Sequence, residues 1–355
     1  MPKATRPVLW SLLAVAVLFG CRKDPSVYTG PVSTPFVLEL PSWVLDSIGP
    51  MLEATDNPLT VEGVALGRKL FYEKELSDDG TMSCATCHVQ ANGFSDPRRS
   101  SIGTDGSIGD RNAMAIVDLA WSRHFFWDGR RTTLEEQAHD PVTNPIEMRN
   151  TWPVVEDRLR SIPTYADLFA AAFGSPQIDS IRIVRAIAQF ERTLVSFNSP
   201  FDRYWYGGDT NAISQAAKDG LDLYTRRGNC GRCHTIGNFT DDVMRNNGLD
   251  LAPEDPGLGA VTGLASDYYK FKTTSLRNIA VTAPYMHDGR FADLLSVVQF
   301  YRSHTAHNSP NVDTAMHNFS TSGYSFSLEE QSNLLEFLNT LTDEEFLTNP
   351  AFSEP

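Results

Sequence analysis

Two Cys-x-x-Cys-His motifs are the residues of this chain whose types and spacing could do the most specific chemistry. They read Cys84-Ala-Thr-Cys87-His88 and Cys230-Gly-Arg-Cys233-His234. In such a motif the two thiols add across the two vinyl groups of haem, and the imidazole of the following histidine ligates the iron. We therefore predict two covalently bound haem c groups, with His88 and His234 as the proximal ligands of the two irons.

Simpler interpretations of the four motif cysteines fit the sequence less well. A zinc ribbon places its two cysteine pairs about 15–20 residues apart, whereas here a whole domain separates the pairs. A structural disulfide or a redox dithiol would need no histidine directly after both pairs. Covalent haem attachment is therefore the favoured interpretation.

The fifth cysteine closes a short export signal. Lys3 and Arg6 give a basic start, residues 8–19 form an apolar run, and Leu18-Phe19-Gly20-Cys21 resembles a bacterial lipobox, in which the cysteine is acylated and becomes the new N-terminus. The run is too short to span a bilayer comfortably. We therefore expect a lipid anchor at Cys21, on the periplasmic side of a bacterial membrane, as the only membrane attachment.

The length and the net charge of the chain limit the number of domains and the kinds of binding partner. A chain of 355 residues is large for one domain and natural for two. The formal net charge of -14 predicts an acidic surface, which is a poor match for nucleic acid or for an anionic membrane. Basic redox proteins are compatible partners.

The elements that must position the two motifs are predicted to be helices. Leu66, Leu70 and Phe71 fall at helical spacing before the first motif, and a strong amphipathic pattern runs through residues 181–194. Further helical patterns cover residues 214–227, 292–303 and 328–341. Sustained β alternation is nearly absent, so the predicted fold class is mainly α.

An internal repeat divides this helical chain in two. After the first motif, Arg111-Asn112 leads to Phe126-Trp127-Asp128-Gly129-Arg130, and after the second, Arg277-Asn278 leads to Met286-His287-Asp288-Gly289-Arg290. Chance recurrence of an Asp-Gly turn would not reproduce this order. We predict two tandem cytochrome c-like helical domains, each with one covalent haem c. The predicted boundaries are 1–20 for the signal peptide, 21–59 for a tether and strap, 60–203 and 204–348 for the two haem domains, and 349–355 for a tail.

Several stretches between about Leu66 and the final helix resemble the bacterial dihaem cytochrome c peroxidase family, which includes MauG, the enzyme that matures a protein-derived quinone cofactor. Besides the two repeated segments, they are Leu134-Glu135-Glu136-Gln137, Asn144-Pro145-Ile146-Glu147-Met148, Thr274-Ser275-Leu276 and Ala283-Pro284-Tyr285. The resemblance implies a cytochrome-c peroxidase-like oxidoreductase. It also implies that peroxide reacts at the N-terminal haem and that the C-terminal haem transfers electrons.

The resemblance assigns roles to residues that would otherwise look structural. Peroxide chemistry needs an open iron position, a base that moves a proton between the peroxide oxygens, and a polar group that holds them. Glu147 matches the distal carboxylate of the family, and Gln137 with Pro141 matches other residues of that pocket. Trp127 matches the tryptophan between the haems, where an indole can relay electrons. Taken alone, Glu147 would be solvated surface and Trp127 a core aromatic residue.

A calcium ion is a further expectation from the resemblance. In relatives it lies near the domain interface, held largely by an asparagine side chain, backbone carbonyls and water. Asn112, Thr282 and Pro284 occupy the matching positions. Oxygen ligands of this kind suit Ca²⁺.

The chain departs from the peroxidase pattern at the first haem. Many family peroxidases carry a distal histidine between the first motif and the Arg-Asn pair, whereas this chain has no histidine between Val89 and Arg111. We therefore expect the first haem to be open without reductive activation. His124 and His139 are the nearest alternatives and are interpreted as ordinary surface or core histidines.

The second departure concerns the sixth ligand of the second haem, which is a methionine in the peroxidases. The matching position here is Tyr301, and MauG also has tyrosine there. The same position lies on the apolar face of the predicted helix, so packing and ligation are compatible. Phenolate ligation favours ferric iron, whereas His/Met ligation raises the potential. Met286, His304 and His307 remain alternatives.

Three functions follow from these residues. The leading one is reduction of hydrogen peroxide to water, with electrons from a small periplasmic protein such as a cytochrome c or a cupredoxin. The second is a MauG-like dihaem oxidase that acts on a protein or organic substrate through high-valent haem. The third is a non-catalytic electron-transfer cytochrome, which Glu147 and Gln137 argue against because a carrier needs no distal proton shuttle. The sequence leaves a homodimer open.

Overall fold

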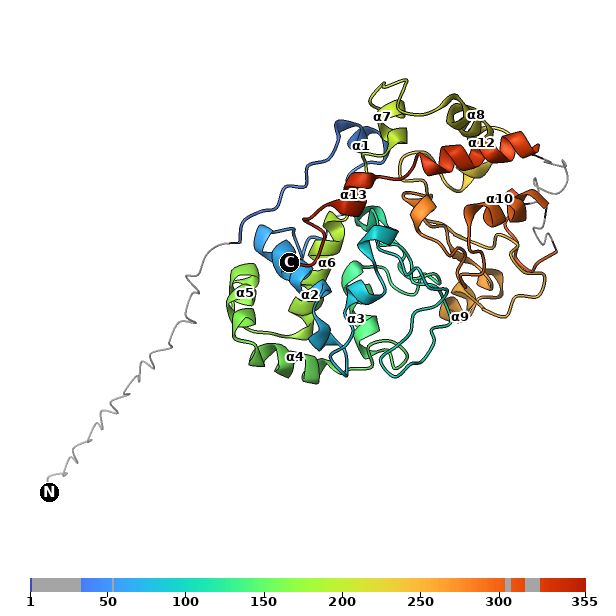
Figure 1. Ribbon diagram of the computed structural model, residues 1–355. Helices are drawn as coiled ribbons and strands as arrows, with labels where there is room; N and C mark the ends of the chain where they lie inside the picture. The colour runs from blue at the N-terminus through green and yellow to red at the C-terminus, as the bar shows by residue number, and fades with distance from the viewer. Residues whose placement is uncertain (2–32, 53, 304–307, 317–325) are drawn as a thin grey trace.

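The computed structural model describes residues 1, 33–52, 54–303, 308–316 and 326–355 (Figure 1). The predicted signal peptide, its lipidation residue Cys21 and the alternative ligands His304 and His307 lie outside the described residues. Within the described part of the chain, no helix is long and apolar enough to cross a membrane.

Helices dominate the described residues, as the sequence predicts. Those of the first half are α1 (Ser42–Ser47), α2 (Val61–Phe71), α3 (Leu134–Thr143), α4 (Trp152–Ser161), α5 (Pro163–Phe173) and α6 (Ser180–Thr193). Those of the second half are α7 (Pro200–Trp205), α8 (Gln215–Thr225), α9 (Leu258–Thr262), α10 (Leu294–Ser303), α12 (Leu328–Asn339) and α13 (Glu344–Thr348). Two short strands, β1 (Met244–Arg245) and β2 (Phe271–Lys272), pair antiparallel.

Each half contains two long helices that cross at a glycine. In Figure 1, α2 lies beside α6 in the first half, and α8 lies beside α12 in the second half. Where α2 crosses α6, a side chain at Gly67 would overlap the carbonyl oxygen of Ala186. Where α8 crosses α12, a side chain at Gly220 would overlap the carbonyl oxygen of Asn333. The missing Cβ atoms therefore permit both close crossings, and the two helix pairs are equivalent.

The loops that follow the haem motifs are also equivalent. Their hydrogen bonds show, however, that the Arg-Asn pairs of the predicted repeat do not occupy equivalent positions. The Asp118 N–H donates to the Leu194 carbonyl at 2.9 Å, and the Asn278 N–H donates to the Leu341 carbonyl at 2.9 Å. Asp118 and Asn278 both have positive φ, 52° and 60°. The structural counterpart of Asn278 is therefore Asp118 and not Asn112, since Asp118 and Asn278 precede Asp128 and Asp288 of their Asp-Gly-Arg turns by the same number of residues.

The Asp-Gly-Arg part of the repeat is present in the structure. An isolated antiparallel bridge closes each turn, Phe125 with Arg131 and Tyr285 with Phe291. Helix α3 follows the first turn and α10 the second at the same spacing. Pro141 on α3 and Tyr301 on α10 therefore occupy corresponding positions.

Buried contacts join the two halves. Arg277 of the second half is fully buried, and its Nε lies 3.3 Å from Asp118 Oδ2 of the first half, while its Nη1 donates to Asp202 Oδ2 of its own half at 2.9 Å. Near the C-terminus, α13 returns to the first half (Figure 1). The ring of Phe346 on α13 lies 5.5 Å from that of Phe94. The two halves, each with one haem motif, are thus packed against each other through buried side chains.

Candidate functional site

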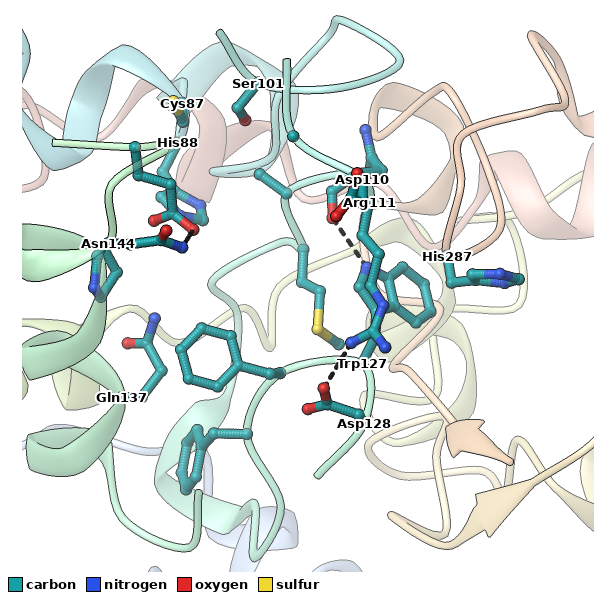
Figure 2. A pocket seen from close by; sticks show the side chains of 18 of the residues that line it. Cys87, His88, Ser101, Asp110, Arg111, Trp127, Asp128, Gln137, Asn144 and His287 are labelled. Atoms are coloured by element: carbon teal, nitrogen blue, oxygen red, sulfur yellow. Dashed lines mark hydrogen bonds and ion pairs between the residues drawn. The ribbon is translucent and has the colours of Figure 1, made fainter. Parts of the chain in front are cut away.

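A cavity of about 1000 Å³ lies beside the first haem motif and extends to loops of the second half. His88 and Asn144 lie on one side of it and Trp127 with Arg111 on the other (Figure 2). Cys84 and Cys87 also line it. A wide cavity with the complete motif in its wall fits a covalently attached haem.

The local structure around His88 prepares its ring for an iron ion. The Cys84–Thr86 segment is a short 3₁₀ helix, and the His88 N–H donates to the Cys84 carbonyl at 3.0 Å. His88 Nδ1 lies 2.9 Å from the Phe94 carbonyl oxygen, which can only accept, so the ring proton is on Nδ1 and Nε2 carries the free lone pair. Burial lowers the pKa of His88, which favours the neutral imidazole that ligates metals.

Glu147 supplies a carboxyl group to the same cavity. It lies in the turn after α3, where the Asn144 side-chain amide donates to its Oε1 at 2.7 Å. Burial raises the pKa of Glu147, while the Asn144 hydrogen bond and the charge of Arg130 oppose the rise. Gln137 lines the cavity from α3, as does Pro141. The structure therefore brings together the three residues that the resemblance assigns to the distal pocket.

Trp127 lies in the cavity wall towards the second half. Its indole N–H donates to the Asn112 carbonyl at 2.8 Å, and its own carbonyl accepts from the N–H of Lys272 on β2 at 2.8 Å. Arg111 lies beside it in Figure 2 and binds Asp255 of the second half through Nε at 2.7 Å. Trp127 therefore lies at the junction of the two halves, and its place between the two haems stays a prediction.

The second haem motif is built in the same way. His234 Nδ1 lies 3.2 Å from the carbonyl oxygen of Phe239 and 3.1 Å from that of Thr274, so its Nε2 is also free of a proton. Burial lowers the pKa of His234. The Tyr224 hydroxyl donates to the His234 carbonyl. This geometry suits a second proximal ligand.

Tyr301 and Met286 converge on one asparagine near the second motif. The Asn247 side-chain amide lies 3.1 Å from the Tyr301 hydroxyl and 3.6 Å from the Met286 sulfur. Burial raises the pKa of Tyr301 to about 12, against the effect of the Asn247 hydrogen bond, and the charges of Cys233 and Cys230 contribute to the rise. Both remaining ligand candidates within the described residues are therefore close to the second site.

The predicted calcium residues are in or beside the junction of the halves. The Asn112 N–H donates to the His287 carbonyl at 2.8 Å, and its side-chain amide donates to the Arg98 carbonyl at 2.9 Å. Thr282 is buried, and Pro284 follows a cis peptide bond. Among the described residues, no three His, Cys, Asp or Glu side chains cluster as a metal site. Calcium at Asn112, Thr282 and Pro284 stays a prediction.

Three features of the site escape motif-based reasoning. They are the hydrogen bond from Asn144 to Glu147, the Arg130 guanidinium 3.4 Å from the Phe126 ring centre, and a buried carboxyl at Glu191 in the cavity wall. Asn144 belongs to the Asn144-Pro145-Ile146-Glu147-Met148 segment that resembles the family, so the sequence could have indicated its contact with Glu147. The sequence holds no comparable signal for Glu191.

A mainly helical chain with two such cysteine and histidine sites, one of them facing a cavity with a partly buried carboxyl, has the architecture of a dihaem c-type oxidoreductase. Comparisons agree with this class. A sequence profile for the di-haem cytochrome c peroxidases matches residues 61–211. The chain is 40% identical over 291 residues to the methylamine utilization protein MauG of Methylorubrum extorquens, covering 81% of this chain and 80% of that protein.

Two further relatives extend the comparison. The cytochrome c551 peroxidase of Nitrosomonas europaea is 34% identical over 292 residues, covering 81% of this chain and 82% of that protein. The crystal structure of a MauG-like protein associated with microbial copper homeostasis is 34% identical, with a TM-score of 0.81, and covers 90% of this chain and 99% of that one.

The chain belongs to the bacterial dihaem cytochrome c peroxidase/MauG family. The predicted family, mainly helical fold class and oxidoreductase class are confirmed. Family membership implies two haem c groups, and the residues around His88 and His234 fit them. Relatives of similar identity include both MauG and peroxidases, so family membership does not decide between the two reactions.

Proposed function

We propose that this protein reduces hydrogen peroxide to water with electrons from a small periplasmic redox protein. The observation that carries the proposal is Glu147, a partly buried carboxyl held by Asn144 in the same cavity as His88. Each turnover consumes one peroxide, two electrons and two protons and releases two waters. A haem iron ligated by His88 would supply the site for peroxide and the route for electrons.

The protein groups in this cavity manage the protons. The Glu147 carboxylate accepts a proton from one peroxide oxygen and returns it to the oxygen that leaves as water. Its raised pKa brings it closer to neutral pH, where a carboxyl exchanges protons most efficiently. Asn144 keeps the carboxylate oriented, and Gln137 can hold a peroxide oxygen by hydrogen bonding.

Electrons enter through the second site in this proposal. The Trp127 indole N–H donates to the Asn112 carbonyl of its own half, and its carbonyl accepts from the Lys272 N–H of the second half, so both ends of the residue are held on the path between the two motifs. The name of the relative from Nitrosomonas europaea, a cytochrome c551 peroxidase, supports a small cytochrome as the donor. The net charge of -14 favours a donor with a basic docking face.

A MauG-like oxidation of a protein or organic substrate is the second candidate. Tyr301 favours it, because a tyrosine at this position resembles MauG and the structure holds its hydroxyl beside Asn247 near the second motif. The absence of a histidine between Val89 and Arg111 favours it too. Phenolate ligation would stabilise the ferric state and hinder reduction of the second haem.

We also propose a domain organisation, a lipid anchor and a calcium site for this protein. The two haem domains span residues 60–203 and 204–348, after a signal peptide at 1–20 and a strap at 21–59, with a tail at 349–355. Cys21 carries the lipid anchor. Calcium at the junction would be detected by elemental analysis of dialysed holoprotein, and its absence there would remove the ion from the proposal.

Steady-state oxidation of a reduced small cytochrome c by hydrogen peroxide tests the proposed function on the holoprotein. Fast turnover that collapses in Glu147→Gln with both haems retained is the expected result. Formation of a stable oxidised haem species with little turnover would reject the peroxidase function and favour the MauG-like oxidase function. If the holoprotein does not react with peroxide, both enzyme functions are rejected and the non-catalytic electron-transfer cytochrome is the function that remains.

A further inference from the structure

Glu191 is a buried carboxyl in the wall of the first haem cavity that the proposed peroxide chemistry does not use. It lies in the last turn of α6, is 3% exposed, and lines the cavity together with Cys84 and Ile187. Its Oε2 atom has no hydrogen-bond partner among the described residues. An unsatisfied buried oxygen costs about 1–3 kcal/mol, so its presence calls for a role beyond packing.

The second half of the same chain shows what this position needs for packing alone. Phe190 and Phe337 occupy equivalent places, because each presents its Cβ to the glycine at its own helix crossing. The residue after Phe337 is Leu338, which is buried in the apolar core of the second half. A leucine therefore satisfies the position, and Glu191 replaces that apolar contact with an ionisable group.

The charges around Glu191 leave it without a dedicated counter-ion. Arg192 is next to it on α6, but its Nη1 and Nη2 donate to the two carboxylate oxygens of Glu135 at 2.8 and 2.9 Å. Burial raises the pKa of Glu191 to about 8, the Arg192 charge opposes the rise, and the Glu135 charge adds to it. The Cys84 thiol in the same wall becomes an uncharged thioether once haem is attached.

Other ionisable side chains on the helices packed against α6 have partners of their own, except Asp167 on α5, which is exposed to solvent. On α2 they are Glu62 with Thr34, Arg68 with the Ser353 carbonyl and Lys69 over the Tyr165 ring; on α3 they are Glu136 with Thr132, His139 against Trp152 and Asp140 with Arg131. On α5, the Tyr165 hydroxyl donates to Glu73. Glu191 is therefore positioned to respond mainly to a change of charge inside the cavity.

We propose that Glu191 is a redox-linked proton acceptor of the first haem cavity. When the iron at His88 gains one electron from the donor, the Glu191 carboxylate binds one proton from solvent, and it releases that proton when the iron is oxidised again. The physical reason is electrostatic, because the added electron destabilises a nearby carboxylate strongly where water is excluded. The cavity thus gains a proton with an electron, and peroxide reduction consumes both.

This inference needs the first haem but does not need peroxidase activity. Its test is a redox titration of the holoprotein, in which the midpoint potential of each haem is followed at a series of pH values around 8. In the unmutated protein the potential of the first haem should fall by up to about 59 mV per pH unit, the value for one proton per electron. In Glu191→Gln the potential should be independent of pH over that range.

Two controls make the titration specific. The second haem, whose corresponding position holds Leu338, provides a reference within each sample. Glu336→Gln removes an exposed carboxylate from α12, the counterpart of α6, and should leave the slope of the first haem unchanged. Glu191→Leu copies the second half and should remove the slope as Glu191→Gln does. An unaltered slope in Glu191→Gln would overturn the proposal.

Infrared difference spectroscopy tests the same step without a variant. Reduction of the unmutated holoprotein should produce a C=O stretching band from a newly protonated carboxyl, and that band should shift in deuterated water. A difference spectrum without such a band would overturn the proposal even if neither Glu191 variant folds. If peroxide turnover is absent but the pH slope and the band are present, only the peroxidase function is rejected.

Discussion

Glu147→Gln isolates proton transfer from every other property of the first site. Glutamine has nearly the same shape, and its side-chain carbonyl can still accept the hydrogen bond that Asn144 now donates at 2.7 Å. The variant loses only the capacity to take a proton. General acid–base catalysis is worth about 10²–10⁴-fold, so kcat/KM for peroxide should fall by that factor, or about 2.7–5.5 kcal/mol of transition-state stabilisation. Stopped-flow mixing with peroxide measures it, while the haem absorbance confirms intact loading.

The matched control is Glu136→Gln on α3, the helix that precedes the Glu147 turn, where the exposed carboxylate only accepts hydrogen bonds from Thr132. It should retain full activity. Peroxide turnover in Glu147→Gln equal to that of the control would refute the assignment of Glu147 as the base.

The pH dependence gives a second, independent readout. The base must be ionised, so kcat/KM should fall as the pH drops below the pKa of Glu147, which burial raises. The Asn144 hydrogen bond stabilises the carboxylate and lowers that pKa. Asn144→Ala removes the bond, so the acid limb of the profile should move to higher pH. A limb that stays in place would show that another group controls it.

Three further predictions follow from the packing. Trp127→Phe should slow electron transfer between the haems and leave the buried Asn112 carbonyl without its indole donor, at a cost of about 1–3 kcal/mol; flash photolysis and denaturant unfolding measure the two effects. Tyr301→Phe should abolish the iron-phenolate band in resonance Raman spectra, and a spectrum unchanged by the substitution would reject Tyr301 and leave Met286, His304 and His307 as the candidate ligands. Gly67→Ala should lower the free energy of unfolding by about 1–3 kcal/mol, because α2 must move away from α6.

The sequence predicts the fold well wherever one local pattern determines the outcome. The predicted helices at 214–227, 292–303 and 328–341 agree with α8, α10 and α12 to within a few residues, because their apolar residues recur at the helical period and pack in the core. The two haem motifs are equally local. The Arg-Asn part of the repeat was wrong in register because similar residue pairs can occur in loops of different length, and only the hydrogen bonds to Leu194 and Leu341 define the true counterparts.

The first site was less predictable because its electrostatics depend on tertiary packing. A glutamate near the end of an amphipathic helix is ordinarily on the solvated face. Helix α6, however, is buried all around in its last turns, since α2 approaches it at Gly67 and α3 covers the other side. That approach is a property of two segments far apart in sequence, and no local pattern predicts that Glu191 is enclosed.

The duplicated fold gives these assignments a common physical basis. The shared positions, such as Gly67 with Gly220, serve the helix crossings that both halves need. At corresponding positions around the two haem motifs the halves differ, with Pro141 opposite Tyr301 and Glu191 opposite Leu338. Proline cannot ligate iron, whereas tyrosine can, and at the other pair of positions the first half has the buried carboxyl of Glu191 where the second half has the leucine side chain. In the proposed assignment, the same scaffold therefore leaves the first iron accessible and coupled to protons through Glu191, and offers the second iron Tyr301 as a candidate ligand.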